Sequence, residues 1–360
     1  MEGSPREPLG GRRGAPRRLR VDAPRIVAIG TAVPDRRFTQ QELADLFGYR
    51  DDLRRRFFFN SDIDGRHVYI TRSDPRAETV DELSARFAEG SVRLGVQAVL
   101  ACLGQTGLGP ADVDFLVTTT CTGRLVPSLD AHLIGALGLR SDVQRVHVGD
   151  TGCASAMVVL QQASNYLRAF PARRVLAVSV ELCSATYYLD EEAETAVANA
   201  IFADGAAAVL LGTTGSGPEI LGHRTLIRPE YLDRMGFTFP GGRHRIRLAP
   251  EVRRIAPAMM EELTGTLLKD FELTQEQVRF WVLHSAGRRV LENAQALLSL
   301  SDADLAYSRD VLRRYGNLSS ATVLFVLDAV LRSGRPKPGD FGLMMALGPG
   351  FAAEGAILRF

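Results

Sequence analysis

The sequence contains little cysteine and almost no lysine. Its 360 residues include four cysteines, which are Cys102, Cys121, Cys153 and Cys183. Lysine occurs only at two positions, Lys269 and Lys337. No CxxC pair and no histidine cluster is present, so we expect neither a disulfide framework nor a zinc or other metal site. Unpaired thiols are typical of a reducing compartment, which predicts a cytoplasmic protein. The use of arginine in place of lysine is typical of a GC-rich bacterial genome.

Long apolar runs and an excess of one charge are also missing. No run approaches the about 20 apolar residues that a membrane-spanning helix needs, so no membrane span is expected. The net charge of +1 gives no reason to expect a nucleic-acid partner. The phosphate-binding motifs GxGxxG and GxxxxGK[ST] are absent, which argues against nucleotide chemistry. With 46% hydrophobic and 24% charged residues, the composition is that of a globular domain.

The chain divides into a short N-terminal extension and two similar halves. Residues 1–24 are rich in Arg, Gly and Pro and have no apolar stretch, so we predict a disordered extension and no secretory signal. Residues 25–214 and 215–360 each alternate buried strands with apolar helices. In each half a strand leads, through a loop with a reactive residue, to a buried helix. This pattern predicts a mixed α/β fold with an internal duplication.

The first reactive residue is Cys153, in the segment TGCASA between a predicted strand and a predicted buried helix. A thiol at a helix N-terminus is expected to have a lowered pKa, because the helix dipole favours the thiolate. The small neighbours leave room for an acyl group. The alternative is that Cys153 is a small buried hydrophobe, as most cysteines are.

Two further residues occupy comparable positions in the second half. His284 ends the predicted strand VRFWVLH, and Asn317 precedes the apolar helix in YGNLSSATVLFVLD. Ligands bind preferentially at the carboxyl ends of strands in α/β folds, which favours a functional role for His284. The alternatives are a hydrogen-bonded structural histidine and a helix-capping asparagine.

Taken together, the three residues have a common chemical use. In a duplicated fold the helices that follow Cys153 and Asn317 are equivalent, so their N-termini would meet at one site beside His284. A thiolate can accept an acyl group from a thioester. An imidazole and an amide can donate hydrogen bonds to the enolate that forms when a malonyl unit loses carbon dioxide. The set predicts decarboxylative condensation without a cofactor.

At this point the sequence resembles the type III polyketide synthases, the chalcone synthase-like family. The resemblance extends from about residue 25 to residue 360 and rests on five segments: TGCASA, FADGAAAVLLG, FWVLHSAGRRV, YGNLSSATVLFVLD and ALGPGFAAEG. It implies a thiolase fold of five layers, αβαβα, in a homodimer that acts on CoA esters. Malonyl-CoA would extend an acyl-CoA starter, or malonyl-CoA alone would be used, and an aromatic or pyrone product would form by ring closure.

The resemblance also implies roles for individual residues. Cys153 would carry the acyl chain, with His284 and Asn317 in the decarboxylation and oxyanion roles. Phe202 and Phe239 match two gatekeeper phenylalanines between the CoA tunnel and the cavity, and packing in the core is the alternative for both. Further matches line the cavity or, for Val126, reach into the partner subunit: Cys121, Thr186, Ser319, Gly348, Pro349, Gly350 and Val126.

Some positions depart from the family pattern. Plant chalcone synthases have Thr at Cys121 and Pro at Ser285. The segment TTTCTG is similar to bacterial tetrahydroxynaphthalene synthases, FFFNSDIDGRH to dihydroxyphenylacetyl-CoA synthases, and ELCSATYYLD to alkylpyrone-forming enzymes. These segments point to different products. The CoA phosphates would be bound by arginines in place of the family's lysines, and a solvated basic helix end is the alternative. The residues concerned are Arg54, Arg55 and Arg56.

Two other functions fit parts of the pattern. A ketoacyl synthase of the initiating type in fatty acid synthesis would share the fold and the Cys-His-Asn set, but HSAGRR and GNLSSA differ from its motifs. A non-catalytic thiolase-fold assembly subunit would be expected to lose at least one of the three residues, and all three are present.

Overall fold

A computed structural model describes residues 23–70 and 74–360. The predicted disordered extension, residues 1–24, falls almost entirely outside the described residues. Within the described ranges, no helix combines the length and apolar character required to cross a membrane.

In the described part of the chain, nine strands form one continuous sheet in the order β11-β12-β13-β8-β1-β7-β6-β4-β5. Their bounds are β1 (Arg25–Ala32), β4 (Phe115–Thr120), β5 (Gln144–Gly149), β6 (Val175–Leu182), β7 (Asp204–Gly212), β8 (Glu219–Ile227), β11 (Val278–Leu283), β12 (Phe341–Gly348) and β13 (Ala352–Arg359). Two small antiparallel pairs join β2 (Arg37–Thr39) to β3 (Gly65–His67) and β9 (Met235–Thr238) to β10 (Arg245–Leu248).

The helices pack on both sides of these strands. They are α1 (Gln40–Leu46), α2 (Asp52–Phe59), α3 (Val80–Leu103), α4 (Leu129–Leu137), α5 (Ser155–Ala169), α6 (Ala193–Ile201), α7 (Val252–Asp270), α8 (Arg288–Leu297), α9 (Ala306–Tyr315) and α10 (Thr322–Arg332). Short 3₁₀ turns include η3 (Gly152–Ala154), η4 (Cys183–Ala185), η6 (Pro240–Gly242), η7 (Gln275–Gln277) and η8 (Ser319–Ala321).

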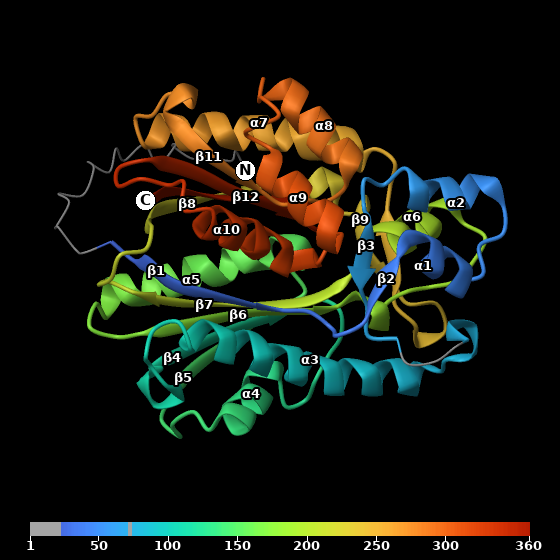
Figure 1. Ribbon diagram of the computed structural model, residues 1–360, viewed down its shortest axis with the longest axis horizontal. Helices are drawn as coiled ribbons and strands as arrows, with labels where there is room; N and C mark the ends of the chain where they lie inside the picture. Colours follow the sequence, from blue (N-terminus) through green and yellow to red (C-terminus); the bar gives the residue numbers. More distant parts are fainter. Residues whose placement is uncertain (1–22, 71–73) are drawn as a thin grey trace, which may run out of the picture.

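These elements form five layers (Figure 1). Helices α3 and α4 cover the strands of the first half, α5 and α10 lie in the middle, and α7 and α8 cover the strands of the second half. The two groups of strands are joined where Arg25 of β1 pairs with Glu219 of β8. The predicted αβαβα order is confirmed. The boundary at residue 214 between two duplicated halves stays a prediction.

The local signals explain why several elements form where they do. Thr39 and Glu42 make a capping box at the start of α1, with the Thr39 side chain accepting from the Glu42 amide at 3.1 Å. Helix α5 buries Met157, Leu160 and Leu167 on one face. Because this face and α10 pack between the two groups of strands, the largest apolar cluster lies at the centre of the molecule.

Parallel pairing brings the reactive segments to shared edges. Strands β4, β5 and β6 run parallel, as do β11 and β12. The segments that follow their carboxyl ends begin at Cys121, Asp150, Cys183, His284 and Pro349. Turn η3 also contacts η8 and β12. Residues far apart in the sequence are therefore collected at the place where the two halves meet.

Candidate active site

Cys153 lies at the centre of these segments and is buried, with 9% of its surface exposed. Its Sγ is 3.4 Å from Ser319 Oγ, so the segment before α10 touches the segment before α5, as the duplicated scheme predicts. Gly348, at the end of β12, packs directly against the segment before Cys153, because a Cβ at Gly348 would lie 2.5 Å from the Thr151 carbonyl oxygen.

The predicted lowering of the Cys153 pKa is wrong. Cys153 sits in the 3₁₀ turn η3, and the α-helix begins only at Ser155. Burial raises the pKa of the Cys153 thiol to about 12, and the charge of Glu181 adds to the rise, while the hydrogen bond with Ser319 opposes it. Desolvation of a charged sulfur therefore outweighs the helix terminus.

His284 follows β11 and is 2% exposed, but neither ring nitrogen has a hydrogen-bond partner among the described residues. Only its backbone is fixed, by a bond from its amide to the Met345 carbonyl at 2.9 Å. The described residues therefore do not provide the hydrogen bond that a structural histidine would make to a neighbouring side chain or backbone group. Burial lowers the pKa of His284 to about 4, so the ring is neutral at physiological pH. A buried polar group without a partner is rare in proteins and is typical of ligand sites.

Asn317 is held on both sides of its amide. Its Oδ1 accepts from the Ser319 amide at 2.9 Å, and its Nδ2 donates to the Ala286 carbonyl at 3.3 Å. The capping alternative is thus partly correct, because Oδ1 caps the turn η8. The amide nitrogen carries two hydrogens, and one remains for a ligand. Since Ala286 lies two residues after His284, Asn317 and His284 belong to one site.

The two predicted gatekeepers differ in position. Phe202 forms a bridge with Asn317, and its carbonyl oxygen accepts from the buried Arg66 at 2.5 Å, so Phe202 belongs to the site. Phe239 is 59% exposed, and its ring centroid lies 5.0 Å from that of His244. The alternative of core packing is wrong for Phe239, because the β9–β10 pair stands outside the main sheet.

Of the remaining predicted residues, some lie at the buried site and one lies outside it. Cys121 is buried 3.3 Å from Ser319 Oγ, and Thr186 is buried with its hydroxyl on the Cys183 carbonyl at 2.9 Å. Pro349 packs on η3, where a Cβ at Gly152 would lie 2.2 Å from its Cδ. Val126 is 99% exposed, outside the buried site.

The predicted CoA-binding arginines are mostly engaged within the chain. Arg54 pairs with Asp51 at 2.8 Å and with Glu191 at 2.9 Å, and Arg55 pairs with Asp45 at 2.6 Å. Arg56 is exposed on the same helix. The geometry therefore leaves Arg56 as the best placed of the three for an incoming phosphate.

Glu181 is a site residue that the sequence analysis missed. It lies near the end of β6, is 0% exposed, and accepts hydrogen bonds from the Cys121 amide at 3.1 Å and the Thr122 hydroxyl at 2.9 Å. The signal was present, because an acidic residue interrupts the apolar run VLAVSVEL. A carboxyl group on a fully buried strand requires such donors.

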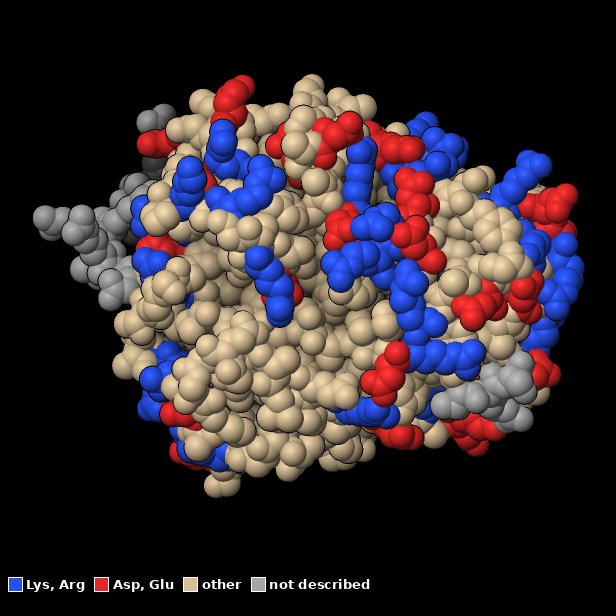
Figure 2. All heavy atoms as spheres, viewed as in Figure 1, with Lys and Arg blue, Asp and Glu red and all other residues tan. Residues whose placement is uncertain are grey.

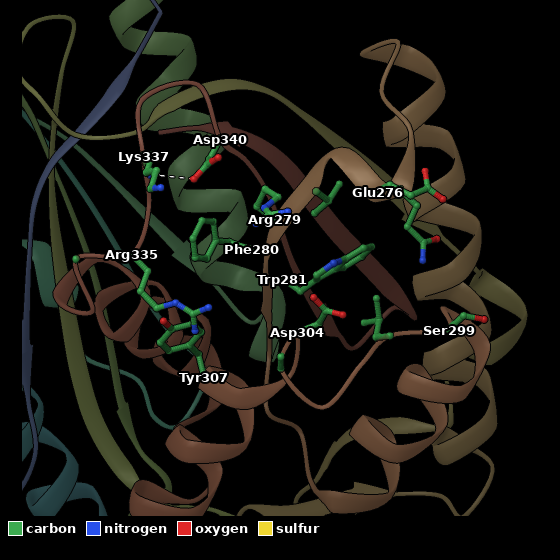
Figure 3. Close-up of a pocket in the computed structure, with 15 residues that line it drawn as sticks. Glu276, Arg279, Phe280, Trp281, Ser299, Asp304, Tyr307, Arg335, Lys337 and Asp340 are labelled. Carbon is green, nitrogen blue, oxygen red and sulfur yellow. Dashed lines mark hydrogen bonds between the residues drawn. The ribbon is translucent and has the colours of Figure 1, made fainter.

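A cavity of about 960 Å³ lies elsewhere, and Figure 3 shows it. Its lining includes Arg279, Phe280 and Trp281 from the amino-terminal part of β11, with Arg335 and Lys337 from the loop before β12. His284 follows the opposite end of β11. This cavity is therefore separate from the Cys153 site.

Comparison with known proteins agrees with this arrangement. Residues 52–219 match the family described as FAE1/Type III polyketide synthase-like protein, and residues 236–360 match the C-terminal domain of chalcone and stilbene synthases. A 3,5-dihydroxyphenylacetyl-CoA synthase from Streptomyces toyocaensis is 32% identical, over 94% of this chain and 90% of the relative. A 1,3,6,8-tetrahydroxynaphthalene synthase from Streptomyces peucetius is also 32% identical, with 93% of each chain covered.

Among solved structures, PKS-I from the brown alga Ectocarpus siliculosus superimposes with a TM-score of 0.87 at 29% identity, covering 94% of this chain and 98% of that one. The predicted thiolase fold is thereby confirmed, and the family matches do not favour a ketoacyl synthase or an assembly subunit. The chain belongs to the type III polyketide synthases, which are acyl-transferring enzymes.

Proposed function

We propose that the enzyme extends an acyl-CoA starter, or malonyl-CoA alone, with malonyl units in repeated decarboxylative condensations. The growing chain is held as a thioester on Cys153 and is released by closure of an aromatic or pyrone ring. The observation that carries the proposal is the buried meeting of Cys153, His284 and Asn317, in which the His284 ring has no partner within the described protein.

In this proposal the neutral His284 ring and the free N–H of Asn317 donate hydrogen bonds to the thioester oxygen of a malonyl unit. These bonds stabilise the enolate as carbon dioxide leaves. The enolate carbon then attacks the acyl group on Cys153. A neutral imidazole suits this use, because it can donate without bringing a buried positive charge.

The surrounding residues have supporting roles. Phe202, beside Asn317, would exclude water from the reacting groups. Phe239 would lie at the outer end of the tunnel through which the CoA ester reaches the cavity. Cys121, Thr186, Ser319, Gly348 and Pro349 would form the cavity wall. Arg56 would hold a CoA phosphate, while Arg54 and Arg55 would bind a phosphate only by exchanging their carboxylate partners for it.

A homodimer is also part of the proposal. Strand β5 ends the sheet, and its residues are mostly exposed, including Val146 at 41%. An open edge of this kind is normally covered by another strand or chain. Val126 precedes α4, and the surface over α4 carries few charged side chains (Figure 2). A second copy that covers this region would bury Val126 against its neighbour.

The predicted cytoplasmic setting also stays a prediction, and all four thiols are free.

The test is incubation of the purified protein with malonyl-CoA, alone and with short, aromatic and long acyl-CoA starters. We expect release of CoA and carbon dioxide and an acyl adduct on the intact protein. Cys153→Ala should abolish the adduct, while Cys102→Ala, a buried thiol in a different apolar cluster, should not. An adduct that persists in Cys153→Ala would refute the assignment of the nucleophile.

The dimer is tested separately by light scattering of the wild type and of Val126→Glu. The change places a charge on a residue that is exposed in the single chain, so it should not destabilise a monomer. We expect a dimer that Val126→Glu weakens. A monomeric wild type at micromolar concentration would contradict the proposal.

A further inference from the structure

Arg66, in the short strand β3, is the largest fully buried side chain in the described part of the chain, with 1% of its surface exposed. Burial lowers the pKa of its guanidinium to about 9, and the charge of Asp204 opposes this shift, so Arg66 is positively charged at neutral pH. A buried charge is costly unless it is hydrogen-bonded. Its Nη2 has no partner among the described residues. The contacts of its other two nitrogens therefore decide what Arg66 does.

These two nitrogens bind the C-terminal end of α6, directly and through Gln40. Nη1 donates to the Phe202 carbonyl at 2.5 Å, and Nε donates to Gln40 Oε1 at 2.9 Å. Gln40 Nε2 in turn donates to the Ala200 carbonyl at 2.8 Å. The last carbonyls of a helix have no partner within the helix and carry the negative end of its dipole, so they favour a cation. Arg66 and Gln40 together therefore cap α6.

The segment that carries Asn317 is paired with the same helix end. The Asn317 amide donates to the Ile201 carbonyl at 2.8 Å, and the Asn317 carbonyl accepts from the Ala203 amide at 2.8 Å. Arg66 also packs on this segment, because a Cβ at Gly316 would lie 2.8 Å from Arg66 Cδ and 2.9 Å from Arg66 Cγ. One buried side chain thus contacts the backbone before Asn317 with its aliphatic stem and the end of α6 with its guanidinium.

We propose that Arg66 is a positioning residue that holds Asn317 and Phe202 in place relative to each other. This inference rests on the proposed function in taking Asn317 as a donor to the thioester oxygen of a malonyl unit. The guanidinium is planar, and its donors have fixed directions, so it restricts where the carbonyl at the end of α6 can lie. A shift of that helix end would carry the paired Asn317 backbone with it.

The consequence of such a shift is a slower reaction. Donors that stabilise an enolate act by being in position before the charge develops. A misplacement of about 1 Å can cost ~100-fold in rate. Without Arg66, the Phe202 carbonyl and Gln40 Oε1 lose a donor inside the protein, and the space beside Gly316 is no longer filled by the same stem. The step that uses Asn317 should therefore be affected more than steps that do not.

The experiment compares two partial reactions in Arg66→Met, which keeps a long side chain but has no donor. One is the release of carbon dioxide from malonyl-CoA, which uses Asn317, and the other is the formation of the acyl adduct on Cys153, followed by intact mass. We expect carbon dioxide release to fall about 10–100-fold and adduct formation to change by less than about threefold. Arg66→Lys retains a cation that can donate to the Phe202 carbonyl, so it should release carbon dioxide several times faster than Arg66→Met.

Leu43→Ala is the matched control for lost stability. Leu43 is 0% exposed and belongs to the apolar cluster against which Phe202 packs, but its side chain makes no hydrogen bond. This variant should lower the free energy of unfolding and leave the ratio of the two partial reactions at the wild-type value.

A double-mutant cycle separates positioning from a general structural role. In the background of Asn317→Ala, Arg66→Met should cause little further loss of carbon dioxide release, because a residue that acts through Asn317 then has nothing left to position. Losses that multiply in the double variant would contradict the proposal.

Hydrogen exchange, followed by mass spectrometry, tests the geometry without any CoA ester. The amides of Asn317 and Ala203 bond across the two segments, so both should exchange faster in Arg66→Met, beyond any increase that Leu43→Ala causes. If Arg66→Met does not fold, Gln40→Met, which removes the acceptor of Arg66 Nε, takes its place with the same expectation.

Unchanged exchange of these two amides would overturn the inference, as would two partial reactions that fall by the same factor. A wild-type protein that releases no carbon dioxide from malonyl-CoA would instead refute the proposed function. In that case the exchange of the Asn317 and Ala203 amides would still decide whether Arg66 holds the two segments together.

Discussion

Gly152, immediately before the proposed nucleophile Cys153, allows one prediction that concerns both the stability of the fold and the geometry of the site. Its φ is +59°, and a Cβ at this position would lie 2.2 Å from Pro349 Cδ and 2.8 Å from Pro349 Cγ. Gly152→Ala therefore meets two costs. The left-handed backbone costs an alanine about 1–2 kcal/mol, and forcing a methyl group against the rigid proline ring costs about 1–3 kcal/mol more.

Gly138 provides a matched control. It has φ of +64° at the C-cap of α4, and a Cβ there would meet nothing within 4 Å. Gly138→Ala should therefore incur the backbone cost alone. We expect Gly152→Ala to lower the free energy of unfolding by about 1–3 kcal/mol more than Gly138→Ala does, as measured by urea denaturation. Only Gly152→Ala should also reduce the rate of Cys153 acylation, because relief of the clash moves η3 or the Pro349 loop.

A double variant tests the cause. Pro349→Ala removes Cγ and Cδ, the two ring atoms that the new methyl group would meet. In the background of Pro349→Ala, the additional loss of stability caused by Gly152→Ala should therefore shrink, with a coupling energy of about 1 kcal/mol or more. Equal losses for Gly152→Ala and Gly138→Ala, with unchanged acylation, would show that the contact between η3 and the Pro349 loop is not as tight as described.

Three other predictions concern pH, the gatekeepers and CoA. Burial lowers the pKa of His284 to about 4. The protein should therefore lose about 3 kcal/mol of its free energy of unfolding as the pH falls from ~6.5 toward 4. His284→Gln should reduce this loss, as measured by urea titrations at each pH. Phe202→Ser should change the range of starters or the product masses in liquid chromatography, and an unchanged profile over several starters would argue against gatekeeping. Phe239→Ala should change stability by less than about 0.5 kcal/mol, since the ring is exposed. Arg56→Ala should raise the KM for CoA esters more at low salt than at high salt, while Arg54→Ala, which leaves Asp51 and Glu191 without their partner, should give the smaller change in KM.

Much of the fold can be predicted from local sequence, because the signals for strands, caps and hairpins come from residues that are close together in the chain. The run VLAVSVEL coincides with β6, and every one of its residues is buried. The Thr39 capping box and the closing β12–β13 hairpin are likewise formed by residues that lie close together in the sequence. The meeting of Cys153 with the segment after Asn317 follows from the duplicated pattern, because equivalent strand-to-helix connections lie at equivalent edges.

The properties that local sequence does not reveal depend on neighbours distant in sequence. Burial around Cys153 comes from η8 and β12, more than 160 residues away, so the helix start alone gave the wrong direction for the thiol pKa. Phe239 stands in a separate two-stranded unit, which apolar patterning does not distinguish from the core. Arg54 and Arg55 form ion pairs that depend on how α2 meets its surroundings. Glu181 was overlooked because an acidic residue near a strand end usually points to solvent.

The strained and unsatisfied groups of the site share one location, and this has a consequence for how the enzyme is built. Gly152 and Ser319 both have positive φ, each lies within two residues of a proposed catalytic residue, and the turns η3 and η8 that they begin are in contact. His284, with two unpartnered ring nitrogens, is in the same region. The left-handed backbone of Ser319 and the unpartnered ring of His284 would each destabilise the fold by themselves, whereas glycine adopts a positive φ without strain. They persist because the apolar cluster of α5 and α10 holds both turns from behind. A substrate oxygen that accepts from His284 would therefore satisfy a group that the free protein leaves unsatisfied, and that gain would be available to binding and catalysis without any change in the fold.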